Sequence, residues 1–320
     1  MVELDGRAVW NGDRRLGPTR IAAWLKDRVL TNHAKKAIGA ARGHSSGAIC
    51  ILLTWKRGLI MKVAIVLMMA CLGGAELSHS GDAKKLTSPI LVELFTSEGC
   101  SSCPPADAWL QRLDNSQPIA GAQAIVLSEH VDYWNHDGWK DPYSSSLFTD
   151  RQSHYVRALG LSSPYTPQVI VGGKSELRLN DPQQVSQVFM DAGKAPQIPV
   201  SIGTINIEGS SPTLLRAHIE VDGTGEKRNG DIYAVVALDH AVSQVLRGEN
   251  GGRRLSHVAV AQEFVKIGKL EKGKTFTQEF QAELNVGTDP RNLRLVVFVQ
   301  EPELGRVLGS AVQESPFSGK

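Results

Sequence analysis

The fold expected for this chain is decided by the stretch Ile90-Leu91-Val92-Glu93-Leu94-Phe95-Thr96-Ser97-Glu98-Gly99-Cys100-Ser101-Ser102-Cys103-Pro104-Pro105. Residues 90–95 form an apolar run that predicts a buried strand, and Pro104-Pro105 predict the first turn of a helix. Cys100 and Cys103 therefore lie at a strand-to-helix junction, where both sulfurs are on one face of the helix start. The unpaired N–H groups and the positive dipole end of a helix stabilise a thiolate, which lowers the pKa of a cysteine placed there.

Predicted strands and helices alternate around this junction. From the periodicity we expect strands at 90–95, 124–131, 168–171 and 175–179, and helices at 105–113, 145–159 and 182–189. This order is that of a thioredoxin-like α/β domain, which we expect over residues 88–195. Beyond a linker, an all-β sandwich-like domain is expected over 198–315, with strands at 200–207, 214–221, 232–239, 258–267, 275–284 and 293–300.

The N-terminal part of the chain has the pattern of a targeting segment. Met61 and Lys62 precede an apolar run that ends in Gly73-Gly74-Ala75, which predicts a signal peptide over 61–75. The run is shorter than the about 20 apolar residues that a membrane-spanning helix needs. Residues 1–60 are then either not translated or a disordered extension. The expected location is periplasmic or secreted, with membrane contact only through the signal segment or through lipidation at Cys71.

The charge of the chain does not favour binding to nucleic acid. Residues 1–62 hold 12 basic and 4 acidic side chains, whereas residues 63–320 hold 23 basic and 29 acidic ones. The overall net charge of +2 is therefore an average of a basic segment and an acidic one.

Only Cys100 and Cys103 remain after cleavage at Ala75. A disulfide between them would close too short a loop to constrain the unfolded chain much, so a redox role is favoured over a structural one. We expect Cys100 as nucleophile and Cys103 as resolving thiol of a thiol–disulfide oxidoreductase, without a cofactor. Its expected partners are exported protein thiols or disulfides, or small thiols. A structural disulfide and a pair of inert thiols remain as alternatives.

Four longer motifs follow one another along the chain. They are residues 92–107; His130-Val131-Asp132-Tyr133-Trp134 with Gly138-Trp139-Lys140-Asp141-Pro142; Tyr165-Thr166-Pro167-Gln168; and Arg247-Gly248-Glu249-Asn250 with Gly252, Arg253, Leu255 and His257. They resemble the motifs of the DUF1223 family, which are exported bacterial proteins with a thioredoxin-like domain. The resemblance covers residues 88–315. It implies the fold and leaves the activity open, because the family has no established one.

Three further residues are candidates for the catalytic site. Thr166-Pro167 resembles the cis-proline loop that faces the cysteines in thioredoxin-like folds, and a cis bond would expose backbone groups of Thr166 to a substrate strand. An ordinary trans proline is the alternative. Glu93 interrupts an apolar strand and is a candidate to pass a proton to Cys103, with a solvated residue at a strand edge as the alternative.

Substrate-binding candidates are His130, Asp132, Trp134 and Tyr165. His130 and Asp132 end the second core strand, and alternation predicts that both lie on one face. The aromatic residues are candidates to line a groove for an apolar or peptide substrate, with packing over the sheet edge as the alternative.

Two other functions remain open from the residues alone. Cys100, Cys103 and His130 are suitable ligands for Cu(I) or Zn, so a metal-binding or copper-delivery module is the second hypothesis. A non-catalytic interaction protein is the third. The loop 247–257 is open between ligand contact, docking onto the first domain and simple solvation.

Overall fold

The computed structural model describes residues 87–209 and 213–316, which belong to one compact unit. The predicted signal segment, the extension before it and Cys71 lie outside the described residues. Within those two ranges, no helix combines the length and the apolar character needed to cross a membrane.

The first seven elements occur in the order that the sequence predicts. They are β1 (Ser88–Thr96), α3 (Pro104–Ser116), β2 (Ala122–His130), α4 (Ser146–Ala158), β3 (Gln168–Val171), β4 (Ser175–Leu177) and α5 (Pro182–Lys194). Local chemistry accounts for the helix starts. The side chain of Ser145 accepts the Leu147 N–H ahead of α4, and Asp181 accepts two N–H groups of the first turn of α5.

The second half consists of strands and one short 3-10 helix. Its elements are β5 (Val200–Ile202), β6 (Asn206–Glu208), β7 (Thr213–Asp222), β8 (Gly230–Gln244), β9 (Arg254–Leu270), β10 (Thr275–Leu284), β11 (Leu293–Gln300), η1 (Pro302–Leu304) and β12 (Val307–Glu314). The predicted strand at 200–207 is two short strands, and the sequence pattern missed β12.

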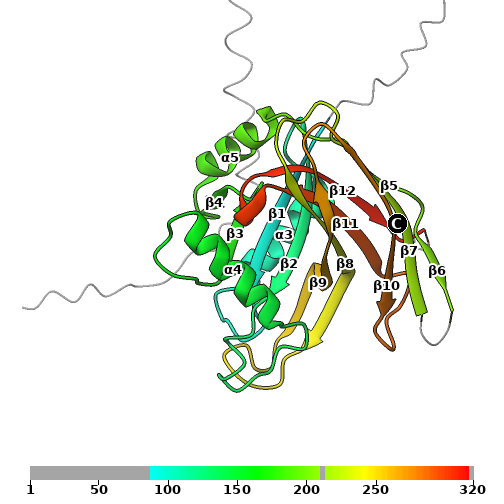
Figure 1. The fold of residues 1–320 in the computed structure, drawn as a ribbon. Coiled ribbons are helices and arrows are strands. Elements are labelled where there is room, and N and C mark those ends of the chain that lie inside the picture. Colours follow the sequence, from blue (N-terminus) through cyan, green and yellow to red (C-terminus); the bar gives the residue numbers. More distant parts are fainter. Residues whose placement is uncertain (1–86, 210–212, 317–320) are drawn as a thin grey trace, which may run out of the picture. The chain divides into compact units, whose positions relative to one another are not determined.

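The expected fold class, an α/β thioredoxin-like domain followed by an all-β sandwich-like domain, is wrong. Eight strands from both halves form one mixed sheet in the order β12-β11-β8-β9-β2-β1-β3-β4 (Figure 1). The two halves meet where Ser128 of β2 pairs in parallel with Val260 of β9. The strands β10, β7 and β5 form a second sheet, with β6 paired to β7. The described chain is therefore mostly β, with a large mixed sheet and three α-helices.

The two-domain prediction failed because the hydrophobic pattern of a strand shows whether its faces are buried, but does not show which strand it pairs with. Residues 258–261 of β9 are buried in succession, as expected for a strand that is covered on both faces. Such a strand belongs in the middle of a sheet, and here it lies between β8 and β2. A separate second domain would have left this strand at an edge.

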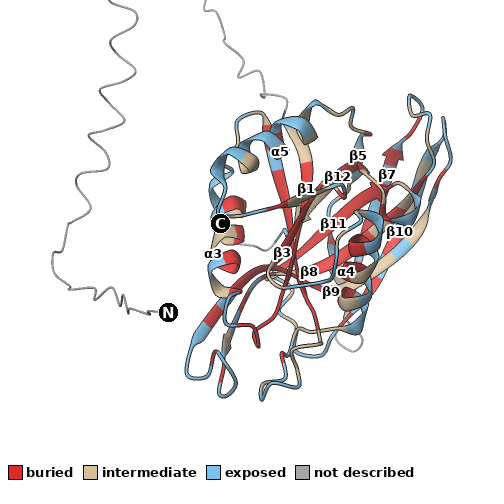
Figure 2. Cartoon of the chain, turned by 90° about the vertical axis from the view of Figure 1, so that its left-hand side faces the viewer, coloured by how far each residue is buried: buried red, intermediate tan, exposed pale blue. Residues whose placement is uncertain are grey.

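Alternation along the strands divides the core between the two faces of the large sheet. Ile90, Val92 and Leu94 of β1 pack against residues of α3 and α5. Leu91 belongs to the cluster on the opposite face, which includes Phe148 of α4. Figure 2 shows the buried residues gathered along the central strands, while α5 presents much of its surface to solvent.

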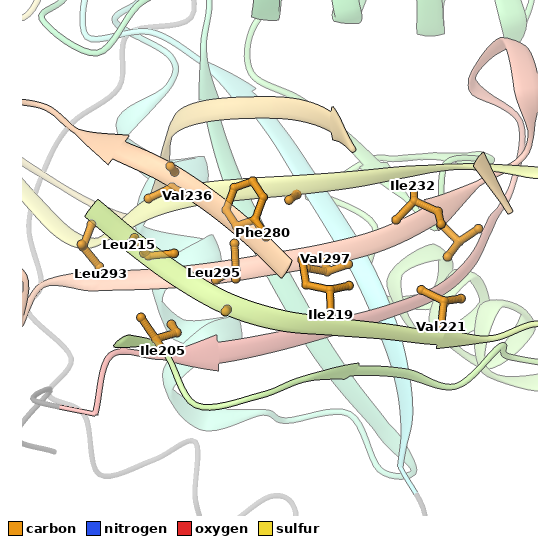
Figure 3. Close-up of a cluster of buried hydrophobic side chains, with 14 of the residues drawn as sticks. Ile205, Leu215, Ile219, Val221, Ile232, Val236, Phe280, Leu293, Leu295 and Val297 are labelled. Carbon is orange, nitrogen blue, oxygen red and sulfur yellow. The ribbon is translucent and has the colours of Figure 1, made fainter. Parts of the chain in front are cut away.

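The smaller sheet packs on the large one through a third apolar cluster. Ile219 of β7 and Phe280 of β10 join Val297 of β11 in it (Figure 3). The two sheets thus enclose a core of their own beside the helix-covered part. At the other end of the molecule, Thr96 pairs with His130 at the ends of β1 and β2. The segments that follow these strands therefore begin side by side.

Candidate functional site

Cys100 and Cys103 lie in the turn between β1 and α3, as the sequence predicts. Both thiols are free, and both residues are buried. The Cys103 N–H donates to the Cys100 carbonyl at 3.2 Å, and Cys103 is the residue directly before α3. The Cys103 carbonyl accepts the N–H groups of Ala106 and Asp107, which begins the helical hydrogen bonding. The pair therefore occupies the N-terminal end of α3.

The two thiols differ sharply in acidity. A hydrogen bond from Cys103, opposed by burial and assisted by the Ser102 and Thr166 side chains, lowers the pKa of Cys100 to about 6. The Ser102 hydroxyl oxygen lies 3.2 Å from the Cys100 sulfur. Burial, followed by the neighbouring Cys100 and the charge of Asp107, raises the pKa of Cys103 far above its usual value. At neutral pH the pair is therefore a Cys100 thiolate beside a protonated Cys103.

The loop around Pro167 borders the Cys100 thiol. The Thr166–Pro167 peptide bond is cis, as predicted. The Thr166 carbonyl oxygen lies 3.8 Å from the Cys100 sulfur and accepts the Ser102 hydroxyl at 3.5 Å. Trp134 donates from Nε1 to the Thr166 hydroxyl at 2.7 Å. The structure thus brings Thr166, Pro167 and Trp134 together with the cysteines.

Access to Cys100 needs a small movement. The residue is 0% exposed, although its neighbours Ser101 and Ser102 are exposed. The Ser102 hydroxyl contacts both the sulfur and the Thr166 carbonyl. Exposed side chains change rotamer within nanoseconds, so the contact between Ser102 and the sulfur can break and reform on that timescale.

Tyr165 and Asp132 have different surroundings. Tyr165 precedes Thr166, is 45% exposed, and donates from its hydroxyl to Glu176 at 2.9 Å. It is therefore placed where a substrate could touch it. Asp132 instead accepts the Thr149 hydroxyl of α4 at 2.6 Å, so its contact is with a helix beside the site.

Glu93 does not lie beside the cysteines. It is completely buried on the face of β1 opposite to Val92 and Leu94, which pack on the side of α3. It accepts the Arg151 Nε–H at 2.7 Å and the Tyr155 hydroxyl at 2.6 Å. The geometry therefore makes Glu93 the counter-ion of a buried arginine and offers no support for a proton shuttle to Cys103.

His130 is also completely buried, behind the cysteine turn. Its Nδ1 lies 2.7 Å from the Asp141 carboxylate, whereas Asp132 accepts from Thr149, so His130 and Asp132 have different partners. Among residues 87–209 and 213–316, no group of three His, Cys, Asp or Glu side chains is arranged to bind a metal ion. The alternative metal site of Cys100, Cys103 and His130 is therefore not assembled.

Sequence reasoning missed a group of buried polar residues below the cysteine turn. Glu98, two residues before Cys100, accepts Trp139 Nε1–H at 2.8 Å and lies 3.4 Å from His257 Nε2. Its own backbone N–H donates to Asp141 at 2.8 Å. The other ring nitrogen of His257 lies 3.7 Å from the Asp107 carboxylate of α3. One imidazole therefore stands between two buried carboxylates.

The charges of this group follow from these contacts. Burial lowers the pKa of His257, but Asp107 and Glu98 outweigh burial and raise it to about 9. Burial likewise opposes ionisation of Asp141, but His130 and two backbone N–H groups hold its pKa below the usual value. The His130 and His257 rings meet edge to face with centroids 4.7 Å apart.

The segment between β8 and β9 docks onto the cysteine turn. Asn250, which is completely buried, donates through Nδ2 to the carbonyls of Glu98 at 2.8 Å and Cys100 at 2.9 Å. Glu249 accepts the Ser101 N–H at 3.0 Å. Of the three alternatives left open for the loop 247–257, docking is therefore the one that the structure shows.

A signal for these missed residues exists in the sequence. Glu98, Asp107, Trp139, Asp141, Asn250 and His257 all stand within the four motifs quoted above. Each motif is remote from the others along the chain, and the fold brings parts of all four to one place. The membership of these residues in the motifs, rather than any single spacing, was the available indication.

Comparisons with known proteins bear on the fold and the family. No curated protein matches the chain. The structure is similar to the crystal structure of protein AGR_C_4864 from Agrobacterium tumefaciens, with 24% identity, a TM-score of 0.56, and coverage of 73% of this chain and 97% of that one. It is also similar to HBP35 of Porphyromonas gingivalis, with 15% identity, a TM-score of 0.52, and coverage of 73% and 79%. At these identities the likeness concerns the fold alone.

The sequence profile of one family, described as "Protein of unknown function (DUF1223)", matches residues 91–300. That range includes the cysteine turn, the loop at Thr166 and the segment that docks through Asn250. The family suspected from the four motifs is therefore confirmed, and this chain belongs to the DUF1223 family.

Proposed function

We propose that this protein carries out thiol–disulfide exchange, with Cys100 as the nucleophile and Cys103 as the resolving thiol. The observation that supports this most is the opposite acidity of two adjacent thiols. The pKa of Cys100 is lowered to about 6, whereas burial and Cys100 itself raise that of Cys103. A thiolate is the attacking species in exchange, so Cys100 is ready at neutral pH.

The reaction has two steps. The Cys100 thiolate attacks one sulfur of a substrate disulfide, forming a mixed disulfide and releasing the first substrate thiolate, which takes a proton from solvent. Cys103 then loses its proton and attacks the Cys100 sulfur, which forms the Cys100–Cys103 disulfide and releases the second substrate thiolate. The protein dithiol is oxidised by two electrons, and the substrate disulfide is reduced to two thiols. The same steps in reverse oxidise a substrate dithiol.

The residues exposed around Cys100 could contact a substrate through hydroxyl groups and through one aromatic ring. Ser101 and Ser102 are exposed above the thiol, and Tyr165 exposes nearly half of its surface beside the Thr166 loop. These residues offer hydroxyls and one aromatic face near the reacting sulfur. Together with the signal segment expected at 61–75, they support thiols and disulfides of exported proteins as the substrate class.

The test is the pH profile of alkylation of the reduced protein by iodoacetamide, with the modified cysteine identified by peptide mass. Cys100 should be labelled first, with a midpoint near pH 6, well below the about 8.5 of a free thiol. In Cys103→Ala the midpoint should move upward, because the hydrogen bond from the Cys103 thiol is lost. The exposed-site variant Ser201→Ala serves as the matched control.

A midpoint near that of a free thiol, or preferential labelling of Cys103, would overturn the assignment. Turnover is checked on the same sample with glutathione disulfide as oxidant. Cys100 and Cys103 should form one intramolecular disulfide, and Cys100→Ser should form none. An oxidised wild type that cannot be reduced again by dithiothreitol would mean a structural disulfide.

A further inference from the structure

The buried group below the cysteines contains titratable side chains that the two exchange steps have not yet used. Asp107 comes from α3, Glu98 from the cysteine turn, and His257 from β9. The Glu98 Oε1 atom and both ring nitrogens of His257 are buried without a hydrogen bond of good geometry among the described residues. Such unsatisfied buried atoms are rare and need an explanation.

Asp107 follows the residue whose thiol must lose a proton, and its charge acts on that thiol. Its backbone N–H donates to the Cys103 carbonyl at 3.1 Å, so the two residues are one helical turn apart on the same face of α3. The Asp107 carboxylate is buried and accepts the Thr96 hydroxyl at 2.9 Å, which fixes its orientation. Cys103 is itself 0% exposed, so its thiol has no direct contact with bulk solvent.

His257 supplies the positive charge that a buried carboxylate requires. Its Nδ1 is 3.7 Å from Asp107 and its Nε2 is 3.4 Å from Glu98. The other groups that face its ring are His130 of β2, at 4.7 Å between centroids, and Tyr143, at 6.2 Å. Asp141 balances His130, with 2.7 Å between carboxylate and ring nitrogen. With its pKa raised to about 9, His257 is an imidazolium at neutral pH.

We propose that Asp107 accepts the proton of Cys103 in the second step of exchange, and that His257 is the positioning residue that keeps Asp107 ionised. This proposal rests on the proposed function. In the step, the Cys103 S–H bond breaks and Asp107 gains the proton. The Cys103–Cys100 bond forms while the bond between Cys100 and the substrate sulfur breaks. The released substrate thiolate is then protonated by solvent, and Asp107 passes its proton to solvent after the substrate has left.

This assignment replaces Glu93, which faces the other side of the sheet. It also explains why His257 of the remote strand β9 is brought beside Glu98 and Asp107. A lone buried carboxylate next to a thiol of raised pKa would be driven to its neutral form by desolvation. The imidazolium between Asp107 and Glu98 offsets that tendency, and so keeps an acceptor available beside Cys103.

The test separates the two steps with the full chain and a symmetrical aromatic disulfide whose released thiolate absorbs visible light. The first equivalent of thiolate reports attack by Cys100, and the second reports resolution by Cys103. Asp107→Asn should leave the first release within about twofold and slow the second by about 100-fold, in the range for loss of one acid–base group. The mixed disulfide should then be visible by intact mass. Asp107→Glu should restore the second release in part.

His257→Gln provides a readout that a merely structural role would not move. The second release should be about tenfold slower than in wild type below pH 9, where wild-type His257 carries its positive charge, and should match wild type above pH 9. The first release should keep its midpoint near pH 6. His218→Gln, at a half-exposed histidine of β7, is the matched control and should change neither release.

Each outcome has one meaning. If wild type shows no first release, the proposed exchange function fails. If the first release is normal and the second is unchanged in Asp107→Asn, the proton-transfer role is overturned while the exchange function stands. Equal slowing of both releases would show that Asp107 only supports the fold and would also overturn the role. Should Asp107→Asn not fold by circular dichroism, the His257→Gln variant decides the question: a slower second release below pH 9 supports the role, and an unchanged second release overturns it.

Discussion

Replacing Glu93 with glutamine should destabilise the protein and leave the cysteine chemistry unchanged. Glu93 is 0% exposed and accepts hydrogen bonds from Arg151 at 2.7 Å and from Tyr155 at 2.6 Å. Arg151 is buried with it, over the rings of four aromatic residues, Tyr155, Tyr233, Phe264 and Phe298. The substitution keeps the shape of the side chain and removes the charge that balances the guanidinium.

The magnitude follows from the buried charge that is left behind. Removing one partner of a buried ion pair costs about 3–5 kcal/mol. Glu129 reduces this loss, because its carboxylate lies 3.7 Å from Arg151 Nε. Burial and then the charge of Glu93 raise the pKa of Glu129 well above its usual value, so loss of Glu93 favours its ionisation. We therefore expect about 3 kcal/mol for Glu93→Gln and about 5 kcal/mol for Glu93→Gln/Glu129→Gln.

The assay is equilibrium unfolding in urea at pH 7, followed by circular dichroism, with alkylation of Cys100 measured on the same samples. Glu279→Gln is the matched control, because its side chain is 76% exposed and a surface ion pair contributes about 0–1 kcal/mol. A loss below about 1 kcal/mol for Glu93→Gln would refute the argument from the buried ion pair. A shift of the Cys100 midpoint away from pH 6 would refute the separation of Glu93 from the site.

Three further predictions concern the site. Asn250→Ala should lower the free energy of unfolding by about 2–4 kcal/mol, because the buried carbonyls of Glu98 and Cys100 both lose their donor; the same measurement on Asn206→Ala, an exposed position, should show almost no change. The reduction potential of the cysteine pair, measured in glutathione buffers, should fall by about 59 mV per pH unit below pH 6, where reduction of the disulfide takes up two protons. Above pH 6 it should fall by about 30 mV per pH unit, because Cys100 stays a thiolate and reduction takes up one proton. A single slope across pH 6 would contradict the lowered pKa of Cys100. In a Cys100→Ser/Cys103→Ser background, the free energy of unfolding should contain the full contribution of charged His257 below pH 6.5 and should decrease as the pH rises to about 9, because folding raises the pKa of His257. The same measurement on His257→Gln in that background should not show this decrease.

Most individual elements could be predicted because their causes are local. The apolar run 90–95, the prolines at 104 and 105, and the cap at Asp181 each act within one turn or strand. β12 was missed because its residues include Gly309 and Ser310 among apolar ones, and it is stabilised by pairing with β11 rather than by its own pattern. Its Gly309 has no room for a side chain, since an added Cβ would meet the Ile198 carbonyl.

The chemistry of the two cysteines was likewise visible in a short segment. Their spacing and the helix start after them predict an acidic Cys100, and the loop at Thr166-Pro167 was expected to face it. The role of Glu93 was misjudged because a single strand shows which residues alternate, but not which face carries the helix of the site. The importance of Glu98, Asp107 and His257 could not be derived from spacing, since His257 lies far along the chain and only the sheet brings it to the other two.

By itself, the sequence determined the two thiols, the turn and helix that hold them, the family and the positions of most strands. Each of these depends on residues that are neighbours along the chain, so a local pattern carries the information. Only the tertiary structure decided that β9 enters the large sheet beside β2, that Asn250 docks on the cysteine turn, and that His257 stands between two buried carboxylates. Strand pairing depends on the total surface that each arrangement buries, and that quantity belongs to the folded chain as a whole.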